Sequence, residues 1–230
     1  GLVVWSYTRS NSNTSVGVGG TTIFGKGDIY GLRGIFLLDG TKTLSHSVTL
    51  SADYKDFSEL TSTGTGGFNT PIRYLPFGAS YAATVVDGDG GSGGGGGYWQ
   101  VGGGITFAVR GLASKQSQFA DKRFLAQSNF ALLRANLGRT QNLPNDFTLV
   151  ATLEGQLSDQ PLISHEQFAA GGVDSVRGYL EASSVGDKGL RTSVELRSGN
   201  LVGEKSAWVG SLTAHTFFDG ALLRLKDVLP

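Results

Sequence analysis

The chain has 230 residues with 19 basic and 19 acidic side chains, 36 glycines, no cysteine and no methionine. This balanced charge gives no reason to expect nucleic acid as a partner, and the missing cysteines exclude disulfides, thiol catalysis and cysteine-bound zinc. No window approaches the roughly 20 continuous apolar residues of a membrane helix, so a membrane crossing would have to use strands.

Alternating apolar and polar residues predict strands along most of the chain. Around Leu50 every second residue is apolar, whereas the positions that alternate with them, such as Ser51, are polar. Leu149 and Glu154 lie on opposite faces of a similar segment. Ten strands are expected, at about residues 2–9, 14–24, 30–38, 43–56, 73–85, 98–111, 124–138, 146–157, 189–198 and 206–219. No stretch shows a helical period with caps, so the predicted class is all-β.

The lengths of these segments favour a transmembrane antiparallel β-barrel. Ten residues at ~3.3 Å each, tilted by ~40°, rise about 25 Å, which is the height of the apolar band of a membrane barrel. In the last strand, Trp208 and Phe218 share the outward face with Leu212 and Ala214. The alternative is a soluble β-sandwich or barrel, but strands in such proteins usually have about 5–6 residues.

Short and long connections alternate, as the two ends of a membrane barrel require. Short turns are expected at 10–13, 39–42 and 141–145, and longer loops at 57–72, 113–123 and 158–188. The glycine-rich tract at 87–97 should lie on the short-turn side. We interpret it as a flexible linker; a calcium-binding Asp/Gly repeat is the alternative, but no second turn of such a repeat follows.

The residue pattern gives no support for an enzyme. The chain has three histidines, His46, His165 and His215. A triad of His215, Asp219 and Ser211 would spread over roughly 26 Å of one extended strand, far beyond hydrogen-bond reach. No His/Asp/Glu cluster has the spacing of a metal site, and the glycines at 102–104 lack the strand-to-helix context of a phosphate loop. We therefore expect no cofactor, metal or small-molecule substrate.

The loop at 158–188 is the longest, and a loop of that length is usually functional or disordered. It contains Pro161-Leu162, Glu166-Gln167-Phe168, Gly171-Gly172, Val176-Arg177-Gly178-Tyr179 and Gly186-Asp187, between Gly155-Gln156 and Glu195-Leu196. These motifs resemble the ShlB/FhaC/HecB family of two-partner secretion transporters. The resemblance extends back to Ile72-Arg73-Tyr74-Leu75-Pro76 and covers nearly the whole chain.

The resemblance implies a fold and a set of site residues. Family members carry periplasmic POTRA domains before a sixteen-stranded barrel, and a VRGY-type motif lies at the tip of a long extracellular loop folded back into the lumen. Val176, Arg177, Gly178 and Tyr179 match that motif, and the family's arginine pairs with an aspartate at the place of Asp219. We expect residues 1–230 to be part of the barrel, because the POTRA domains and the first and last strands are missing. Ten strands alone would leave two open edges.

The residues themselves support this pairing. Counting by twos from Asp219 reaches Phe217 and the polar face of the strand, so Asp219 should point into the lumen, where it avoids the cost of a charge in lipid. The planar fork of Arg177 suits a two-pronged carboxylate contact, and Gly178 permits a left-handed backbone. A solvated loop arginine is the alternative.

The resemblance also implies a function. It predicts a translocator in the outer membrane of a Gram-negative bacterium that secretes a large haemolysin- or adhesin-type exoprotein, with that exoprotein and membrane lipid as its partners. A barrel-assembly insertase of the same superfamily is the alternative, and a porin comes third, since a porin has no reason to carry the Arg177 motif. Two POTRA domains after a short N-terminal helix would favour secretion, five an insertase and none a porin.

Overall fold

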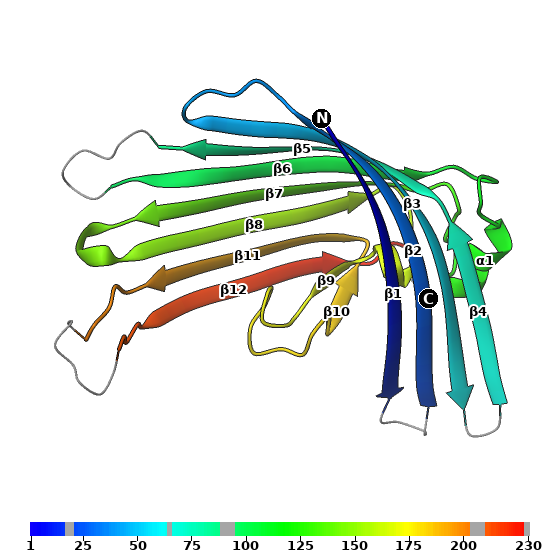
Figure 1. Ribbon diagram of the computed structural model, residues 1–230. Helices are drawn as coiled ribbons and strands as arrows, with labels where there is room; N and C mark the ends of the chain where they lie inside the picture. The colour runs from blue at the N-terminus through cyan, green and yellow to red at the C-terminus, as the bar shows by residue number, and fades with distance from the viewer. Residues whose placement is uncertain (17–20, 64–65, 88–94, 203–209, 228–230) are drawn as a thin grey trace.

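The computed structural model describes residues 1–16, 21–63, 66–87, 95–202 and 210–227. It is one large, curved, antiparallel sheet with loops gathered at one end (Figure 1). The strand order is β1-β2-β3-β5-β6-β7-β8-β11-β12, and β4 pairs with β3 beside β5. The all-β prediction is confirmed.

The wall strands are mostly ten residues or longer. They are β1 (Leu2–Val16), β2 (Thr21–Leu37), β3 (Leu44–Thr63), β4 (Gly66–Tyr74), β5 (Pro76–Val86), β6 (Gly97–Ala108), β7 (Ala131–Asn142), β8 (Thr148–Ser158), β11 (Lys188–Arg197) and β12 (His215–Arg224). The connections contain the helix α1 (Gln116–Lys122), the 3-10 turns η1 (Pro144–Asp146) and η2 (Ser164–Glu166), and a small hairpin of β9 (Phe168–Ala170) and β10 (Ser184–Gly186). Among the described residues, no helix is long and apolar enough to span a membrane.

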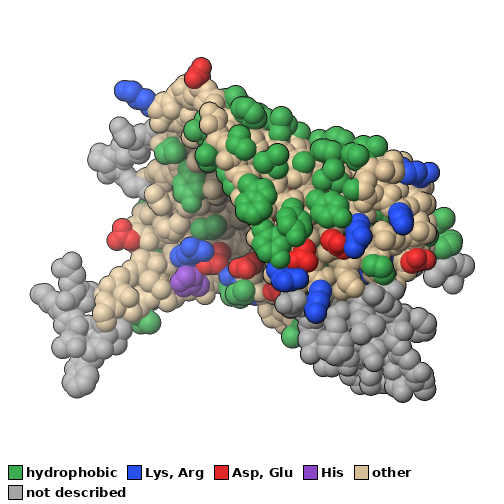
Figure 2. Space-filling model, turned by 45° about the vertical axis from the view of Figure 1, so that its right-hand side comes forward, with side chains coloured by type: hydrophobic (Ala, Val, Ile, Leu, Met, Phe, Trp, Pro, Cys, Tyr) green, Lys and Arg blue, Asp and Glu red, His purple; other side chains and the backbone are tan. Residues whose placement is uncertain are grey.

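The two faces of the sheet differ in chemistry as the alternation predicts. Ser51 and Glu154 line one hollow on the inner face, whereas Leu50 on the outer face is 51% exposed. Phe218 also points outward, at 69% exposure. Figure 2 shows apolar side chains gathered over one face of the molecule. An outer surface of this kind requires an apolar environment, because soluble monomers rarely expose large apolar patches.

A row of tyrosines crosses the outer face of the first three strands. The rings of Tyr7 and Tyr30 lie 5.1 Å apart, and those of Tyr30 and Tyr54 lie 6.3 Å apart, measured between centroids. Beyond this row β3 and β4 continue as a paired extension. Aromatic rows of this kind mark the membrane interface in β-barrels.

The buried core lies at the loop end of the sheet. Its residues are Ile72, Tyr74, Ala108, Phe119, Ala126, Phe130, Leu132, Leu162 and Ile163. They come from β4, β6, α1, the connection between α1 and β7, β7 itself and the long loop, so the core holds the connections against the wall. This arrangement differs from a sandwich, in which a core fills the space between two sheets.

Several sequence-based boundaries are wrong. No turn lies at 10–13, and the expected strand 14–24 does not exist as a separate element, because β1 pairs without a break with β2 from Leu2 to Val16. The Ser/Asn-rich run at 10–13 has turn-like composition, but pairing along the neighbouring strand overrides that local preference.

Two of the expected loops are ordered elements. The segment 57–72 is the β3–β4 hairpin, whose pairing spans Lys55 to Tyr74, and 113–123 contains α1. That helix has no side-chain cap and is held by the buried Phe119. Neither a capping residue nor a helical period in the sequence therefore predicts it.

Two other strands begin later than expected. β7 begins at Ala131 rather than 124, and β12 begins at His215 rather than 206. The position of Trp208 and most of the glycine-rich tract lie outside the described residues. The connection between β5 and β6 does lie at the short-turn end, since Val86 N donates to Thr43 O at 2.7 Å and Asn142 N to Gly96 O at 2.9 Å.

The assignment of faces can be tested with arginine substitutions at Leu50 and Ser51. Leu50→Arg should destabilise the folded full-length protein in lipid by ~2–4 kcal/mol if the residue lies near the midplane, because it places a charge in hydrocarbon. Ser51→Arg should be tolerated, since the inner hollow is polar. Urea titration of both variants in bilayers gives the free energies of unfolding, and equal losses would contradict the assignment.

Candidate functional site

The tip of the long loop is fastened to β12 through Arg177 and Asp219. Arg177 Nε lies 2.8 Å from Asp219 Oδ2, and its Nη2 lies 2.9 Å from Oδ1. The backbone N–H of Arg177 also donates to Oδ2 at 3.0 Å. This is the two-pronged contact expected from the sequence, reinforced by a main-chain donor.

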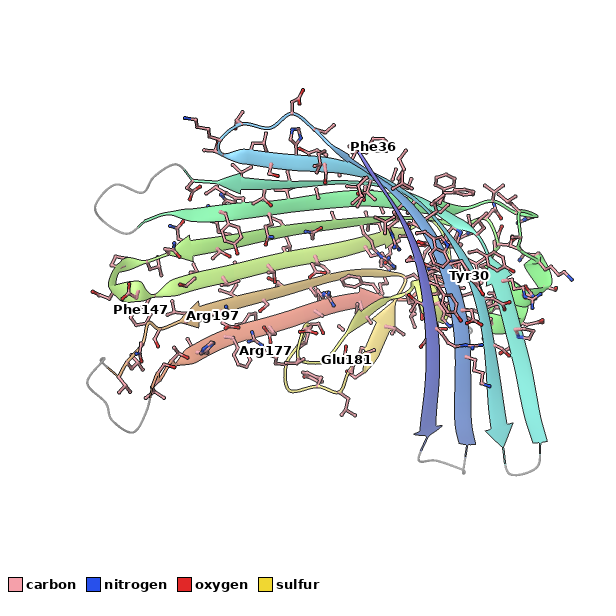
Figure 3. The ribbon with its side chains drawn as sticks, in the orientation of Figure 1. Tyr30, Phe36, Phe147, Arg177, Glu181 and Arg197 are labelled. Carbon is pink, nitrogen blue, oxygen red and sulfur yellow. The ribbon has the colours of Figure 1, made fainter. Side chains whose placement is uncertain are left out.

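The other side of the guanidinium contacts β11 and an aromatic ring. Nη1 donates to Glu195 Oε2 at 2.5 Å and Nη2 to Ser193 Oγ at 3.2 Å. The guanidinium carbon lies 3.5 Å from the centroid of the Phe217 ring, a cation–π arrangement. Arg177 therefore makes contacts through both edges of its guanidinium and through its face. Figure 3 shows Arg177 beside β12.

The pairing of β11 and β12 brings these acceptors together. Ser193 lies opposite Asp219, and Glu195 lies opposite Phe217. All four share the inner face because residues two apart on a strand point the same way. The Asp219 side chain is only 3% exposed, so without Arg177 it would leave a poorly hydrated, unpaired charge on the wall.

The charge of Arg177 is fixed by its partners. Hydrogen bonds to Asp219 and then to Glu195 raise the pKa of Arg177 above its ordinary range, so it stays cationic at any physiological pH. Glu195 Oε1 accepts two more hydrogen bonds, from Arg197 Nε at 2.6 Å and from His215 Nδ1 at 2.9 Å.

The remaining motif residues have different surroundings. Gly178 has φ +90°, a backbone conformation that side chains other than glycine rarely adopt. Val176 is buried, whereas Tyr179 is 68% exposed. Of the four motif residues, Arg177 therefore supplies the polar anchor, and Gly178 supplies the chain reversal beside it.

A family model matches the part of the chain that contains these contacts. The family model described as haemolysin secretion/activation protein ShlB/FhaC/HecB matches residues 93–222, which is more than half of the chain. The chain belongs to the ShlB/FhaC/HecB family. The matched range includes the long loop and Asp219 on β12.

A solved structure of similar fold is CdiB from Escherichia coli. It superposes with a TM-score of 0.77 at 17% sequence identity, over 99% of this chain and 41% of the CdiB chain. At that identity the likeness shows a shared fold, and this ShlB/FhaC/HecB family chain spans less than half the length of CdiB. No curated protein matched this sequence.

The histidines do not form a catalytic group. His215 contacts Glu195, and His46 lies on the outer face with Nδ1 3.1 Å from the Tyr81 hydroxyl. His165 stacks on Phe57 with ring centroids 4.1 Å apart. Within the part of the chain that the structure describes, no three His, Asp or Glu residues form a group that could hold a metal ion.

Glu195 is part of the sequence pattern that resembles the family, but that pattern assigns it no role. The alternation of β11 contained the signal, because Arg191, Ser193, Glu195 and Arg197 all occupy its polar face. Choosing Glu195 among them required the register with β12, which no local pattern shows.

Replacement of Glu195 by Gln should loosen the tip. The change removes a charge-assisted hydrogen bond of ~1.5–3 kcal/mol, so a thiol introduced by Val176→Cys should react with a maleimide about tenfold faster or more. The native sequence has no cysteine to interfere. Glu154→Gln is the matched control, since Glu154 pairs with Arg191, away from the tip. Equal labelling rates in both variants would show that Glu195 does not hold the tip.

Proposed function

We propose that this chain forms part of the barrel of a two-partner secretion translocator, which passes a large haemolysin- or adhesin-type exoprotein across the outer membrane of a Gram-negative bacterium. Membership of the ShlB/FhaC/HecB family and the curved antiparallel sheet support this proposal. In the whole protein, POTRA domains and further strands would complete the arrangement. The partners are the exoprotein on the inner side of the wall and lipid on its outer side.

The inner face suits the passage of an unfolded chain. A hollow of about 580 Å³ is lined by small or uncharged side chains from β5, β6 and β7, with Arg134 and Glu154 also on its lining. Small polar side chains offer hydrogen bonds to a passing backbone and few deep apolar pockets that would retain it. Transport of this kind needs no catalytic residue and no cofactor, and its energy would come from folding of the exoprotein outside the cell.

The observation that carries the proposal is the set of contacts made by Arg177. A passive pore needs no charged loop tip fixed by Asp219 and Glu195, whereas a translocator needs a loop held in a defined place at rest. The ShlB/FhaC/HecB family model covers the residues that make these contacts. We therefore assign Arg177 and Asp219 as the lock of the resting state, supported by Phe217.

The lock can be tested by a double-mutant cycle on export. Arg177→Ala and Asp219→Ala should each impair export of the exoprotein while the barrel still inserts, because each leaves a partner without its mate at a cost of ~1–3 kcal/mol. The double variant should be little worse than either single one. Arg177→Lys should restore only part of the activity, since an ammonium cannot make the two-pronged contact.

The matched control is the pair Arg9 and Asp28 on β1 and β2. Their side chains meet at 3.1 Å, but that of Arg9 is 62% exposed, so alanine there should leave export unchanged. Export is measured as secreted exoprotein per folded barrel, with folding followed by heat-modifiable migration. Defects of Arg177→Ala and Asp219→Ala that simply add would mean that the two residues do not act as a pair.

A further inference from the structure

The long loop has a stem and a tip that are held in different ways. We define the stem as residues 158–170 and 184–187 and the tip as residues 171–183. Among hydrogen bonds between described residues, those that join the tip to the wall all come from Arg177. The stem is instead held by the buried side chains of Glu166, Asp187 and Gln156. These three are separate from the contact between Arg177 and Asp219.

Asp187 gathers three segments around one carboxylate. Its side chain is 0% exposed and forms a two-pronged pair with Arg123, Nη1 to Oδ1 at 2.5 Å and Nη2 to Oδ2 at 2.7 Å. The backbone N–H groups of Leu162 and Lys226 donate to it at 2.9 and 2.7 Å. One side chain therefore joins the stem to the α1 connection and to the chain beyond β12.

The ionised form of Asp187 is the stable one. Burial alone would raise its pKa, but hydrogen bonds from Arg123, Lys226 and Leu162 outweigh burial and hold the pKa below its ordinary range. A carboxyl with a lowered pKa stabilises the fold above its unfolded-state pKa and loses that contribution as pH falls through the folded value. The Asp187 contact thus persists at neutral pH.

Glu166 holds the first segment of the stem, residues 158–170, against the wall. Its Oε1 accepts hydrogen bonds from Lys55 Nζ at 2.6 Å and from the Tyr74 hydroxyl at 2.8 Å, and its side chain is 2% exposed. Burial and then the nearby Glu166 charge raise the pKa of Tyr74 well above its usual range, so the phenol remains a donor. Both partners belong to the paired extension of β3 and β4.

Gln156 on β8 joins both halves of the stem to the wall. Its Nε2 donates to the backbone oxygens of Glu166 at 3.0 Å and of Asp187 at 3.2 Å, and its Oε1 accepts from Arg134 Nε at 2.7 Å. Gln156 itself is 1% exposed. Both segments of the stem are therefore hydrogen-bonded to the same wall residue.

The tip leaves the stem through a neck with unusual backbone angles. Gly171 and Gly172 have φ +111° and +105°, and Ala182 on the returning side has φ +48°. A glycine pair of this kind accepts large changes of backbone angle at low cost. The neck is thus the place where the tip can turn relative to the stem.

We infer that Glu166, Asp187 and Gln156 are positioning residues that keep the stem on the wall throughout export, so that the tip alone swings at the Gly171-Gly172 neck when Arg177 is released. This inference rests on the proposed secretion function. It specifies that the loop does not leave the lumen as a unit.

A neutralising substitution tests the positioning role of Asp187. Asp187→Asn should increase maleimide labelling at Val176→Cys and lower export severalfold, with the yield of folded barrel unchanged. In an Arg177→Ala background the same change should add little to the labelling rate, because the tip is already free. Asp174→Asn, on the exposed surface of the tip, is the matched control. A lower barrel yield without faster labelling would show that Asp187 serves only barrel stability, which would overturn its positioning role.

A disulfide tests whether the stem stays in place. An ideal Cβ on Gly189 of β11 would lie 2.4 Å from the Phe168 ring of β9, so Phe168→Cys with Gly189→Cys places two thiols within reach. The oxidised full-length protein should export at the rate of its reduced form. Loss of export on oxidation, restored by a reductant, would show that the stem must move and would overturn the inference.

A second pair covers the case in which the first variant does not fold. Ala169→Cys with Val185→Cys joins directly opposed residues of β9 and β10 and closes the stem on itself. Export by this variant should also be the same in both redox states. Loss on oxidation would show that the two segments of the stem must separate, which would also overturn the inference. An unsubstituted protein that exports nothing would instead contradict the proposed function.

Discussion

A nearly buried carboxylate on the inner wall sets the main constraint on this structure. Asp219 lies on a strand whose other face carries exposed apolar side chains, so its charge must point inward. There it is too little hydrated to remain unpaired. Arg177 provides two side-chain hydrogen bonds and one main-chain hydrogen bond, and the tip of a long loop is thereby fixed at one point of the wall.

The other residues of the site position Arg177 against Asp219. Gly178 makes the chain reversal that aims the side chain, and Phe217 provides the surface beneath the guanidinium. Glu195 accepts a hydrogen bond from Nη1 of Arg177, and its own carboxylate is held by Arg197 and His215. A loop anchored in this manner lies on the inner face of the wall. In the proposed translocator, release of Arg177 from Asp219 would free the loop tip while the strand pairing of the wall stays unchanged.

Strand alternation is a local signal, and it predicted the membrane-type sheet and its two faces. The contact between Arg177 and Asp219 was expected from the resemblance of residues 176–179 to the motif of the ShlB/FhaC/HecB family, together with the inward direction of Asp219 on its strand. The sequence pattern did not predict the continuous β1 and β2 or the β3–β4 hairpin, since long-range pairing overrides the turn-like composition of residues 10–13. The stem contacts of Asp187 and Glu166 were also out of reach. Arg123 is 64 residues from Asp187, and Lys55 is 111 residues from Glu166, so only the folded sheet brings them together.

We expect the loop tip to rest against β12 in the membrane-embedded protein. The most direct measurement is disulfide formation between Val176→Cys and Ala221→Cys in native outer membranes, since these two residues line one hollow between the tip and β12 and the contact between Arg177 and Asp219 is kept. We predict rapid, near-complete crosslinking in the resting protein and a decrease while the exoprotein is in transit. If this pair stays reduced under oxidation, while Phe168→Cys with Gly189→Cys crosslinks in parallel, the tip does not dock on β12 and the account is wrong.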